Sequence, residues 1–327
     1  MRKIELPPAV CGGAFPADPD FPQLRIATDP AVMLEVFRSH LKPVAGTPLH
    51  IQDCTPCRFR CRQSTSRCVL QYVLRVVEPG TGRQWDQWVT GLIYADLGEA
   101  ERLWREMHSA DPRRDIPESW LTFEPVDFIP ELRMLLQLFP YDRKLRNLGA
   151  VLSGAAGEIE PALLARLGPG QWRVEQRNLE PMRYRTELGA ALKYTVRARD
   201  TLTARSESVR CYLKVYRNQQ GAETFQLLQS LNGRAAERQE PYSVVRPIAY
   251  LSELRTLALE EAAGTSLQQV LLDGRAVVRG RGSCVETSTC GSRFGSCACA
   301  TVWAALGPSA SSANASKLDV ETRAALI

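Results

Sequence analysis

The sequence lacks the long apolar runs and clustered charges that mark two large classes of protein. No stretch approaches the roughly 18 consecutive apolar residues of a membrane helix, so no membrane-spanning segment is expected. The 41 basic and 36 acidic residues are spread along the chain, which argues against a nucleic-acid patch. The basic N-terminus is interrupted by Glu5, Pro7 and Pro8 and has no apolar signal-peptide core. These absences predict a cytoplasmic protein that binds neither membrane nor nucleic acid.

Paired metal-ligand spacings are also scarce. Cys54 and Cys57 have the spacing of a zinc knuckle, but no second Cys-x-x-Cys or histidine pair follows at finger spacing. Cys61 and Cys68 fall on predicted strands, where thiols commonly pack against apolar side chains. We therefore predict no metal site, and we expect cytoplasmic cysteines to be mostly reduced.

What the sequence does have is an internal repeat at an offset of 122 residues. One register holds without a gap across residues 70–145 and their counterparts. The matched residues include Leu70 and Leu192, Tyr72 and Tyr194, Pro125 and Pro247, Leu135 and Leu257, and 131–133 with 253–255. The chain is therefore expected to contain two copies of one structural unit.

Both copies show the same elements, namely three strands, a helix and two more strands. The strands are predicted from runs of β-branched and aromatic residues and the helices from apolar residues at helical spacing. In the first copy we expect strands at 58–61, 68–74, 88–94, 128–129 and 134–136, with a helix at 98–108. In the second copy we expect strands at 182–185, 191–196, 210–216, 244–250 and 256–259, with a helix at 221–231. Further helices are expected at 31–41 and 159–167.

These elements predict an α+β fold with two tandem antiparallel sheets, each carrying one helix. Residues 1–45 form an N-terminal segment with one helix, 46–150 the first copy, and 151–273 the second copy. From 274 to 327 Gly, Ser, Ala and Cys dominate and periodicity disappears, so an irregular, disordered tail is expected.

The second copy carries a lysine in the middle of its third strand. Lys214 lies between Leu213 and Val215, and a lysine on a sheet face among apolar neighbours needs an anionic partner, for which a phosphate is one candidate. A strand lysine that extends to solvent is the alternative. The last strand of this copy runs into Glu260 and Glu261, which are either part of a ligand site or exposed turn acids.

These segments resemble a known family. The strand YLKVY, the helix after it, the Val-Val-Arg-Pro-Ile strand and the segment LALEEAAGTSL are similar to the N-terminal lobe of the aminoglycoside phosphotransferase and choline kinase-like family, which has the protein-kinase-like fold. The resemblance covers residues 171–272. It implies two kinase N-lobe-like units, of which the first is a degenerate copy.

The resemblance also implies a nucleotide site in the second copy. Lys214 would pair with the α- and β-phosphates of ATP, and the turn at 186–190, which contains Gly189, would lie over the phosphates. The helix would supply a glutamate to the lysine, and Glu223 is the acid inside it. Backbone groups around Glu260, Glu261 and Ala262 would meet the adenine.

The catalytic half of such an enzyme is not found. It requires an Asp in an H-x-D-type loop, a later Asn and a second Asp that holds Mg²⁺. All three histidines precede the second copy, and Asp273, Asn314 and Asp319 are not in a usable arrangement. We therefore assign no catalytic residue, expect the C-lobe to be absent, and do not expect Mg²⁺ binding by this chain alone. The resulting hypothesis is a truncated or pseudo phosphotransferase that binds ATP.

The first copy lacks the polar groups of the second. Leu92 stands at the position of Lys214, and Leu138 and Phe139 stand at those of the two glutamates. This copy is interpreted as scaffold or as an interaction surface.

The alternative hypothesis belongs to another class, a non-enzymatic protein-interaction module built from two N-lobe-like units. A protein partner would then contact residues such as Trp85, Trp88 or Trp104, provided that they are exposed rather than buried in the core.

Overall fold

A computed structural model describes residues 18–44, 46, 48–62, 67–238 and 244–262. The predicted tail lies outside these residues. The described residues form two compact units. Unit 1 consists of those up to Glu158 together with Pro181–Leu192 and Val215–Arg217, and unit 2 of Ile159–Glu180, Lys193–Lys214 and the described residues from Asn218 onward.

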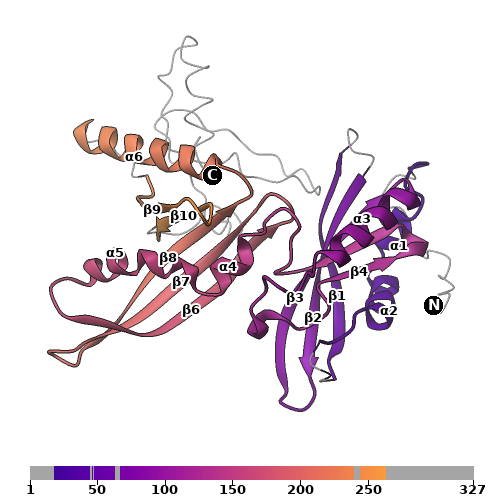
Figure 1. The fold of residues 1–327 in the computed structure, drawn as a ribbon, viewed down its shortest axis with the longest axis horizontal. Helices are drawn as coiled ribbons and strands as arrows, with labels where there is room; N and C mark the ends of the chain where they lie inside the picture. Colours follow the sequence, from indigo (N-terminus) through magenta and orange to yellow (C-terminus); the bar gives the residue numbers. More distant parts are fainter. Residues whose placement is uncertain (1–17, 45, 47, 63–66, 239–243, 263–327) are drawn as a thin grey trace, which may run out of the picture. The chain divides into compact units, whose positions relative to one another are not determined.

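The α+β prediction is confirmed, because the chain contains two five-stranded antiparallel sheets with identical strand order (Figure 1). The first sheet has the order β1-β2-β3-β5-β4 and the second β6-β7-β8-β10-β9. The strands of the first are β1 (His50–Arg62), β2 (Arg67–Glu78), β3 (Arg83–Tyr94), β4 (Val126–Ile129) and β5 (Met134–Leu138). Those of the second are β6 (Trp172–Arg185), β7 (Gly189–Asp200), β8 (Ser206–Tyr216), β9 (Pro247–Leu251) and β10 (Thr256–Glu260).

Helices cover both faces of the first sheet. On one face lie α1 (Leu24–Ala27) and α2 (Pro30–His40), and α3 (Leu97–Ser109) packs against β3, β4 and β5 on the other (Figure 1). Asp29 starts α2, because its carboxylate accepts hydrogen bonds from two first-turn amides and a proline follows it. Since both faces are covered, β2 is buried at almost every position and does not alternate.

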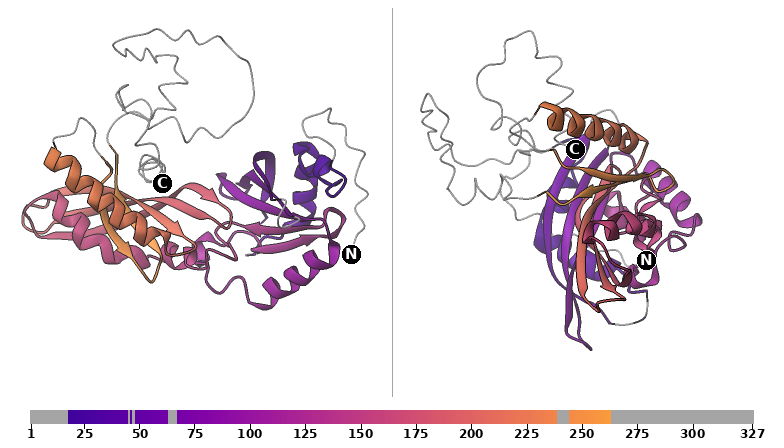
Figure 2. Two further views of the ribbon diagram at one scale, coloured as in Figure 1. Left: turned by 90° about the horizontal axis from the view of Figure 1, so that it is seen from above. Right: turned by 90° about the vertical axis from the view of Figure 1, so that its left-hand side faces the viewer.

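The second sheet carries α6 (Gln220–Arg238), which packs against β9 and β10 (Figure 2). Shorter helices come before this sheet in the chain: α4 (Leu148–Leu152), α5 (Glu160–Leu164) and the 3₁₀ turns η4 (Ala155–Ile159) and η5 (Ala165–Leu167). Two further 3₁₀ turns, η2 (Glu118–Trp120) and η3 (Pro130–Leu132), belong to unit 1.

Several strand boundaries differ from the sequence expectation; β1, for example, begins at His50 rather than at 58. β6 begins at Trp172, ten residues before the expected start at 182, because a largely exposed edge strand is polar and carries no apolar signal. β9 begins at Pro247 rather than at Val244, since a proline has no amide to donate and is favoured as the first residue of a strand.

The 122-residue offset holds as a structural register. Ile129 pairs with Met134 in the first sheet, and Leu251 pairs with Thr256 at the matched positions of the second. Arg133 and Arg255, in the connecting turns, both adopt a left-handed backbone with φ of 45°. A strained backbone conformation at matched arginines supports the duplication more strongly than the identity of the residues does.

No helix in the described ranges has the length and apolar character needed to cross a membrane.

Candidate functional site

Lys214 lies in β8, the third strand of the second sheet. Its neighbours Leu213 and Val215 are buried, with 0% and 2% of their surface exposed, whereas Lys214 is half-buried. Adjacent strand residues face opposite sides of a sheet, so Lys214 lies on the face opposite these two side chains. The aliphatic part of the Lys214 side chain is therefore partly shielded from water, on the sheet face opposite the buried Leu213 and Val215.

The matched position in unit 1 shows what the same fold does with an apolar residue there. Leu92 is fully buried and belongs to the core beneath α3, together with Tyr94, Ala100 and Met107. The two copies therefore differ in the use of an equivalent strand position: core packing in one, a charged group in the other.

The acids expected near the adenine lie at the end of β10, the strand beside β8. Glu260 is half-buried and lies 3.5 Å from Arg166, and the exposed Glu261 lies 3.0 Å from Arg210. Ala262 is exposed directly after them. Both carboxylates have arginine partners, and the Glu260 amide donates to the carbonyl of Arg246 at 3.0 Å. The adenine contacts that the resemblance implies here stay a prediction.

Glu223 lies in the first turn of α6 and is exposed. The expected pairing of Glu223 with Lys214 stays a prediction. An acid placed this early in the helix serves its N-terminus, where a negative charge is favourable.

Gly189 is the first residue of β7 and follows the turn that connects β6 to β7. A Cβ at this position would lie 2.8 Å from the backbone oxygen of Val215, so close approach to β8 requires glycine here. Its predicted position over ATP phosphates stays a prediction.

Thr186 and Glu187, which precede Leu188 and Gly189 in this turn, are buried in unit 1. Glu187, with 2% of its surface exposed, contacts Arg67 at 2.5 Å, Arg143 at 2.7 Å and Lys144 at 3.5 Å. Thr186 is also buried and is bonded at 2.6 Å to the hydroxyl of Thr90. The turn is thus fixed by an ionic cluster of one carboxylate and three cations.

A second carboxylate supports the same turn. Asp142 accepts hydrogen bonds from the Glu187 amide at 2.7 Å, the Tyr184 hydroxyl at 2.8 Å and the Lys144 amide at 2.8 Å. Burial raises the pKa of Asp142 above its usual range despite these bonds. Burial also opposes ionisation of Glu187, but the hydrogen bonds and charges of Arg67 and Arg143 outweigh it and lower the pKa of Glu187 to about 2.

Sequence reasoning missed this cluster. Arg67 and Glu187 are 120 residues apart, so no local pattern joins them. The sequence feature that could have indicated the cluster is Arg67, which directly precedes an apolar strand. An arginine buried at that position requires an acidic partner.

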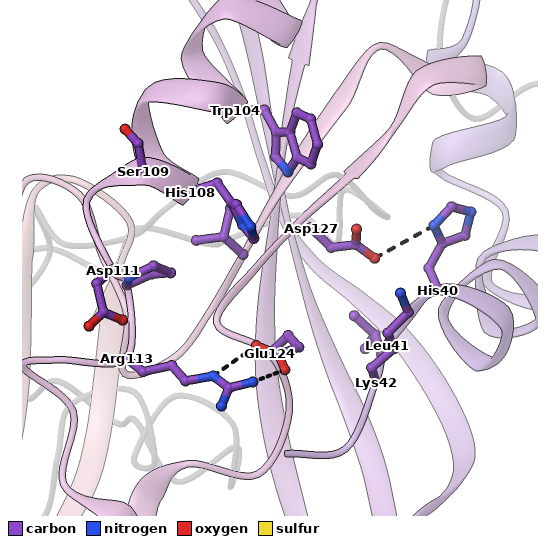
Figure 3. A pocket seen from close by; sticks show the side chains of 12 residues that line it. His40, Leu41, Lys42, Trp104, His108, Ser109, Asp111, Arg113, Glu124 and Asp127 are labelled. Atoms are coloured by element: carbon purple, nitrogen blue, oxygen red, sulfur yellow. Dashed lines mark hydrogen bonds and ion pairs between the residues drawn. The ribbon is translucent and has the colours of Figure 1, made fainter. Parts of the chain in front are cut away.

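Unit 1 also contains a pocket of about 580 Å³ (Figure 3), within the size range of small-molecule sites. The end of α3 supplies Trp104 and His108, whose rings stack with centroids 5.7 Å apart. Arg113 forms an ion pair with Glu124 across the pocket. The other lining residues include His40, Leu41, Lys42, Ser109, Asp111, Pro112, Val126 and Asp127.

One histidine of this pocket, His40, lies near a carboxylate but is not positioned to act as a catalytic base. His40 Nδ1 lies 3.6 Å from Asp127 Oδ2, which is beyond hydrogen-bonding distance. Because a base must be oriented by a close partner, we assign no catalytic role to this pair. The pocket thus combines an aromatic pair from α3 with charged side chains such as Arg113 and Glu124.

The tryptophans considered as an interaction surface are half-buried rather than fully buried. Trp85, Trp88 and Trp120 line a groove of about 490 Å³ in unit 1, whereas Trp104 lies in the pocket described above. Trp88 also packs edge-on against Phe139 and stacks on Tyr184.

Within the described ranges, no group of three or more His, Cys, Asp or Glu side chains is arranged to hold a metal ion. No protein-family model, curated protein or solved structure matches this chain.

Proposed function

We propose that the second copy of the repeat is a nucleotide-binding lobe of the aminoglycoside phosphotransferase and choline kinase-like type, in which Lys214 holds the phosphates of ATP. The order of its elements supports this proposal: three strands, a helix and two further strands, with the lysine on the third strand. The backbone at the end of β10, next to β8, is where the adenine would bind.

One observation carries the proposal, the exchange of a fully buried leucine for a half-buried lysine at matched positions of two copies in register. Leu92 contributes to a core, and replacing such a residue by lysine loses apolar burial and adds a desolvated charge. The phosphates of a nucleotide would offset that cost, and the family resemblance implies this role for a lysine on the third strand.

The proposal assigns binding and not phosphate transfer. No residue of the described chain is assigned as catalytic base or as magnesium ligand. A nucleotide bound at Lys214 would thus stabilise the fold or regulate it.

Thermal unfolding with millimolar ATP tests the proposal. A ligand at ten times its Kd stabilises by about 1.4 kcal/mol, which corresponds to roughly 3–5 °C for a chain of this size. Lys214→Met should abolish the shift while leaving the melting temperature without ATP within a few degrees of wild type.

The matched control is Lys193→Met on the adjacent strand β7. Lys193 is 22% exposed and forms a salt bridge with Glu180, so it is a comparable lysine outside the proposed site. This variant should keep the full ATP shift. An unchanged melting temperature of the wild-type protein at saturating ATP would refute nucleotide binding.

A second candidate function is a protein-interaction module, favoured by the tryptophan-lined groove of unit 1. Aromatic grooves bind proline-rich segments in the polyproline II conformation, because the extended helix presents flat apolar rings. Titration with a proline-rich peptide should quench tryptophan fluorescence, and Trp120→Ser should weaken binding at least tenfold. Equal affinity of variant and wild type would eliminate this candidate.

A further inference from the structure

Two cysteines face each other on adjacent strands of unit 1. Cys61, near the end of β1, and Cys68, near the start of β2, are directly paired across the antiparallel ladder. Their sulfur atoms lie 3.0 Å apart, and both are free thiols. Directly opposed residues in an antiparallel pair have Cα atoms about 4.5–5.5 Å apart, within the range that a disulfide spans. A movement of about 1 Å would bring the sulfurs to bonding distance.

The two thiols have complementary environments. Cys61 is exposed and can meet a soluble reagent, whereas Cys68 is completely buried and is shielded from it. Burial raises the pKa of the Cys68 thiol far above its usual range, so this sulfur is a poor nucleophile until a neighbouring sulfur is activated. An exposed attacking cysteine beside a buried resolving cysteine is the arrangement that favours one defined product.

The nearest other cysteines do not offer the same geometry. Cys54 is paired with Leu74 on β2, and Cys57 lies at a register shift of β1. Cys54 and Cys57 are three residues apart on one extended strand, a separation of about 10 Å that a disulfide cannot span.

We propose that Cys61 and Cys68 form a reversible disulfide by exchange with a low-molecular-weight disulfide such as oxidised glutathione. The Cys61 thiolate attacks one glutathione sulfur, which forms a mixed disulfide and releases one glutathione. The Cys68 thiolate then attacks the Cys61 sulfur, which forms the protein disulfide and releases the second glutathione. The protein dithiol loses two electrons to the glutathione disulfide, and its two protons pass to the released glutathione thiolates.

The crosslink would act on the ionic cluster that holds the β6–β7 turn. Arg67, the neighbour of Cys68, starts β2 and contacts Glu187. Tying β1 to β2 one residue away restrains the backbone that carries this guanidinium. In a reducing compartment such a bond is transient, so its formation would report a shift toward oxidising conditions.

The test uses the full-length protein equilibrated in buffers of increasing ratio of oxidised to reduced glutathione. Free thiols are then blocked by alkylation, and the cysteines are mapped by mass spectrometry. We expect a peptide pair joined at Cys61 and Cys68, with two hydrogen atoms lost and no alkylation of either residue. The oxidised protein should melt several degrees higher than the reduced protein, because closing a short loop restricts the unfolded chain.

Two variants sharpen the test. Cys61→Ser changes an exposed residue and should abolish both the crosslink and the redox-dependent melting shift. Cys57→Ser, on the same strand, should change neither. The proposal is overturned if both thiols remain alkylated in oxidised glutathione, if Cys61 stays as the glutathione mixed disulfide, or if it joins a different cysteine.

Discussion

Removing the charge of Glu187 should destabilise unit 1 far more than removing the charge of a surface acid. The change Glu187→Gln keeps the shape of the side chain but leaves the guanidinium of Arg67 without its counter-charge. Both side chains are almost completely buried, with 3% and 7% of their surface exposed. A cation that cannot reach water retains most of its desolvation cost when its partner is neutralised.

Two independent arguments give the loss of unfolding free energy expected for Glu187→Gln. The pKa of Glu187 falls from 4.5 to about 2, which corresponds to about 3 kcal/mol of stabilisation of the ionised form. Breaking a buried ion pair by removing one partner typically costs about 3–5 kcal/mol. We therefore expect a loss of about 3 kcal/mol, because Arg143 and Lys144 are more exposed and can turn toward solvent.

The assay is urea unfolding at pH 7, followed by tryptophan fluorescence in the transition that contains unit 1. Glu101→Gln, in the same unit, is the control, since Glu101 is 38% exposed and lies 2.9 Å from the exposed Arg105. It should lose less than about 1 kcal/mol. A loss below about 1 kcal/mol for Glu187→Gln would refute the view that the cluster holds the turn.

The pH dependence provides a second check on the same group. A carboxyl whose folded pKa is depressed contributes stability above its unfolded pKa and loses it as the pH falls through the folded value. The difference between wild type and Glu187→Gln should thus shrink between about pH 4.5 and pH 2. Asp142 has a raised pKa and contributes with the opposite sign, but it is present in both proteins and largely cancels in the difference. A difference that stays constant down to pH 2 would contradict the assignment.

Other positions give sharp expectations for stability. Gly149→Ala should cost about 2 kcal/mol or more in urea unfolding, because the added Cβ would overlap the backbone oxygen of Asp115. By contrast, the Cβ added by Gly233→Ala in α6 meets open space, so this change should be neutral or stabilising by up to about 1 kcal/mol. Ala204→Gly should raise the urea midpoint by the equivalent of about 0.5–1 kcal/mol, since its φ of 58° is strained for any residue with a Cβ. Tyr194→Phe should lose about 1.5–3 kcal/mol, because its hydroxyl donates to a largely buried carboxylate at 2.5 Å. Lys214→Leu should stabilise the protein without ligand by about 1 kcal/mol while abolishing the ATP-dependent shift, as calorimetry with and without ATP would show.

The central strands of both copies could be predicted because they are apolar and rich in β-branched and aromatic residues. On β2, Leu70, Tyr72 and Val73 belong to such a run, which is typical of a buried strand. The ends of β1 and β6 escaped prediction, since polar residues at an exposed edge pair through their backbones and leave no side-chain signature. The repeat predicted more of the strands than residue propensity did, because each strand of one copy indicates the position of its counterpart in the other.

The candidate site could be proposed from the sequence only where it depends on one strand. Lys214 is visible in the sequence because its neighbours are apolar and its counterpart is a leucine. The cluster around Glu187 is not visible, because its cations come from β2 and from the segment after β5. Tertiary packing decides which residue of a polar turn becomes buried, and local sequence contains little information about that choice.

The comparison of the two copies separates what the fold needs from what it does not. Tyr72 and Tyr194 are both buried, and each donates its hydroxyl to a group from a helical segment that precedes its sheet: the carbonyl of Ala27 or the carboxylate of Glu160. The fold therefore retains the tyrosine in both copies. At Lys214 it does not require the lysine, because the other copy packs a leucine at the same place with no exposed surface. Lys214→Leu therefore separates two explanations. A lysine kept for ligand binding gives a variant of higher stability that has lost the nucleotide response, whereas a lysine that serves the fold gives a variant of lower stability.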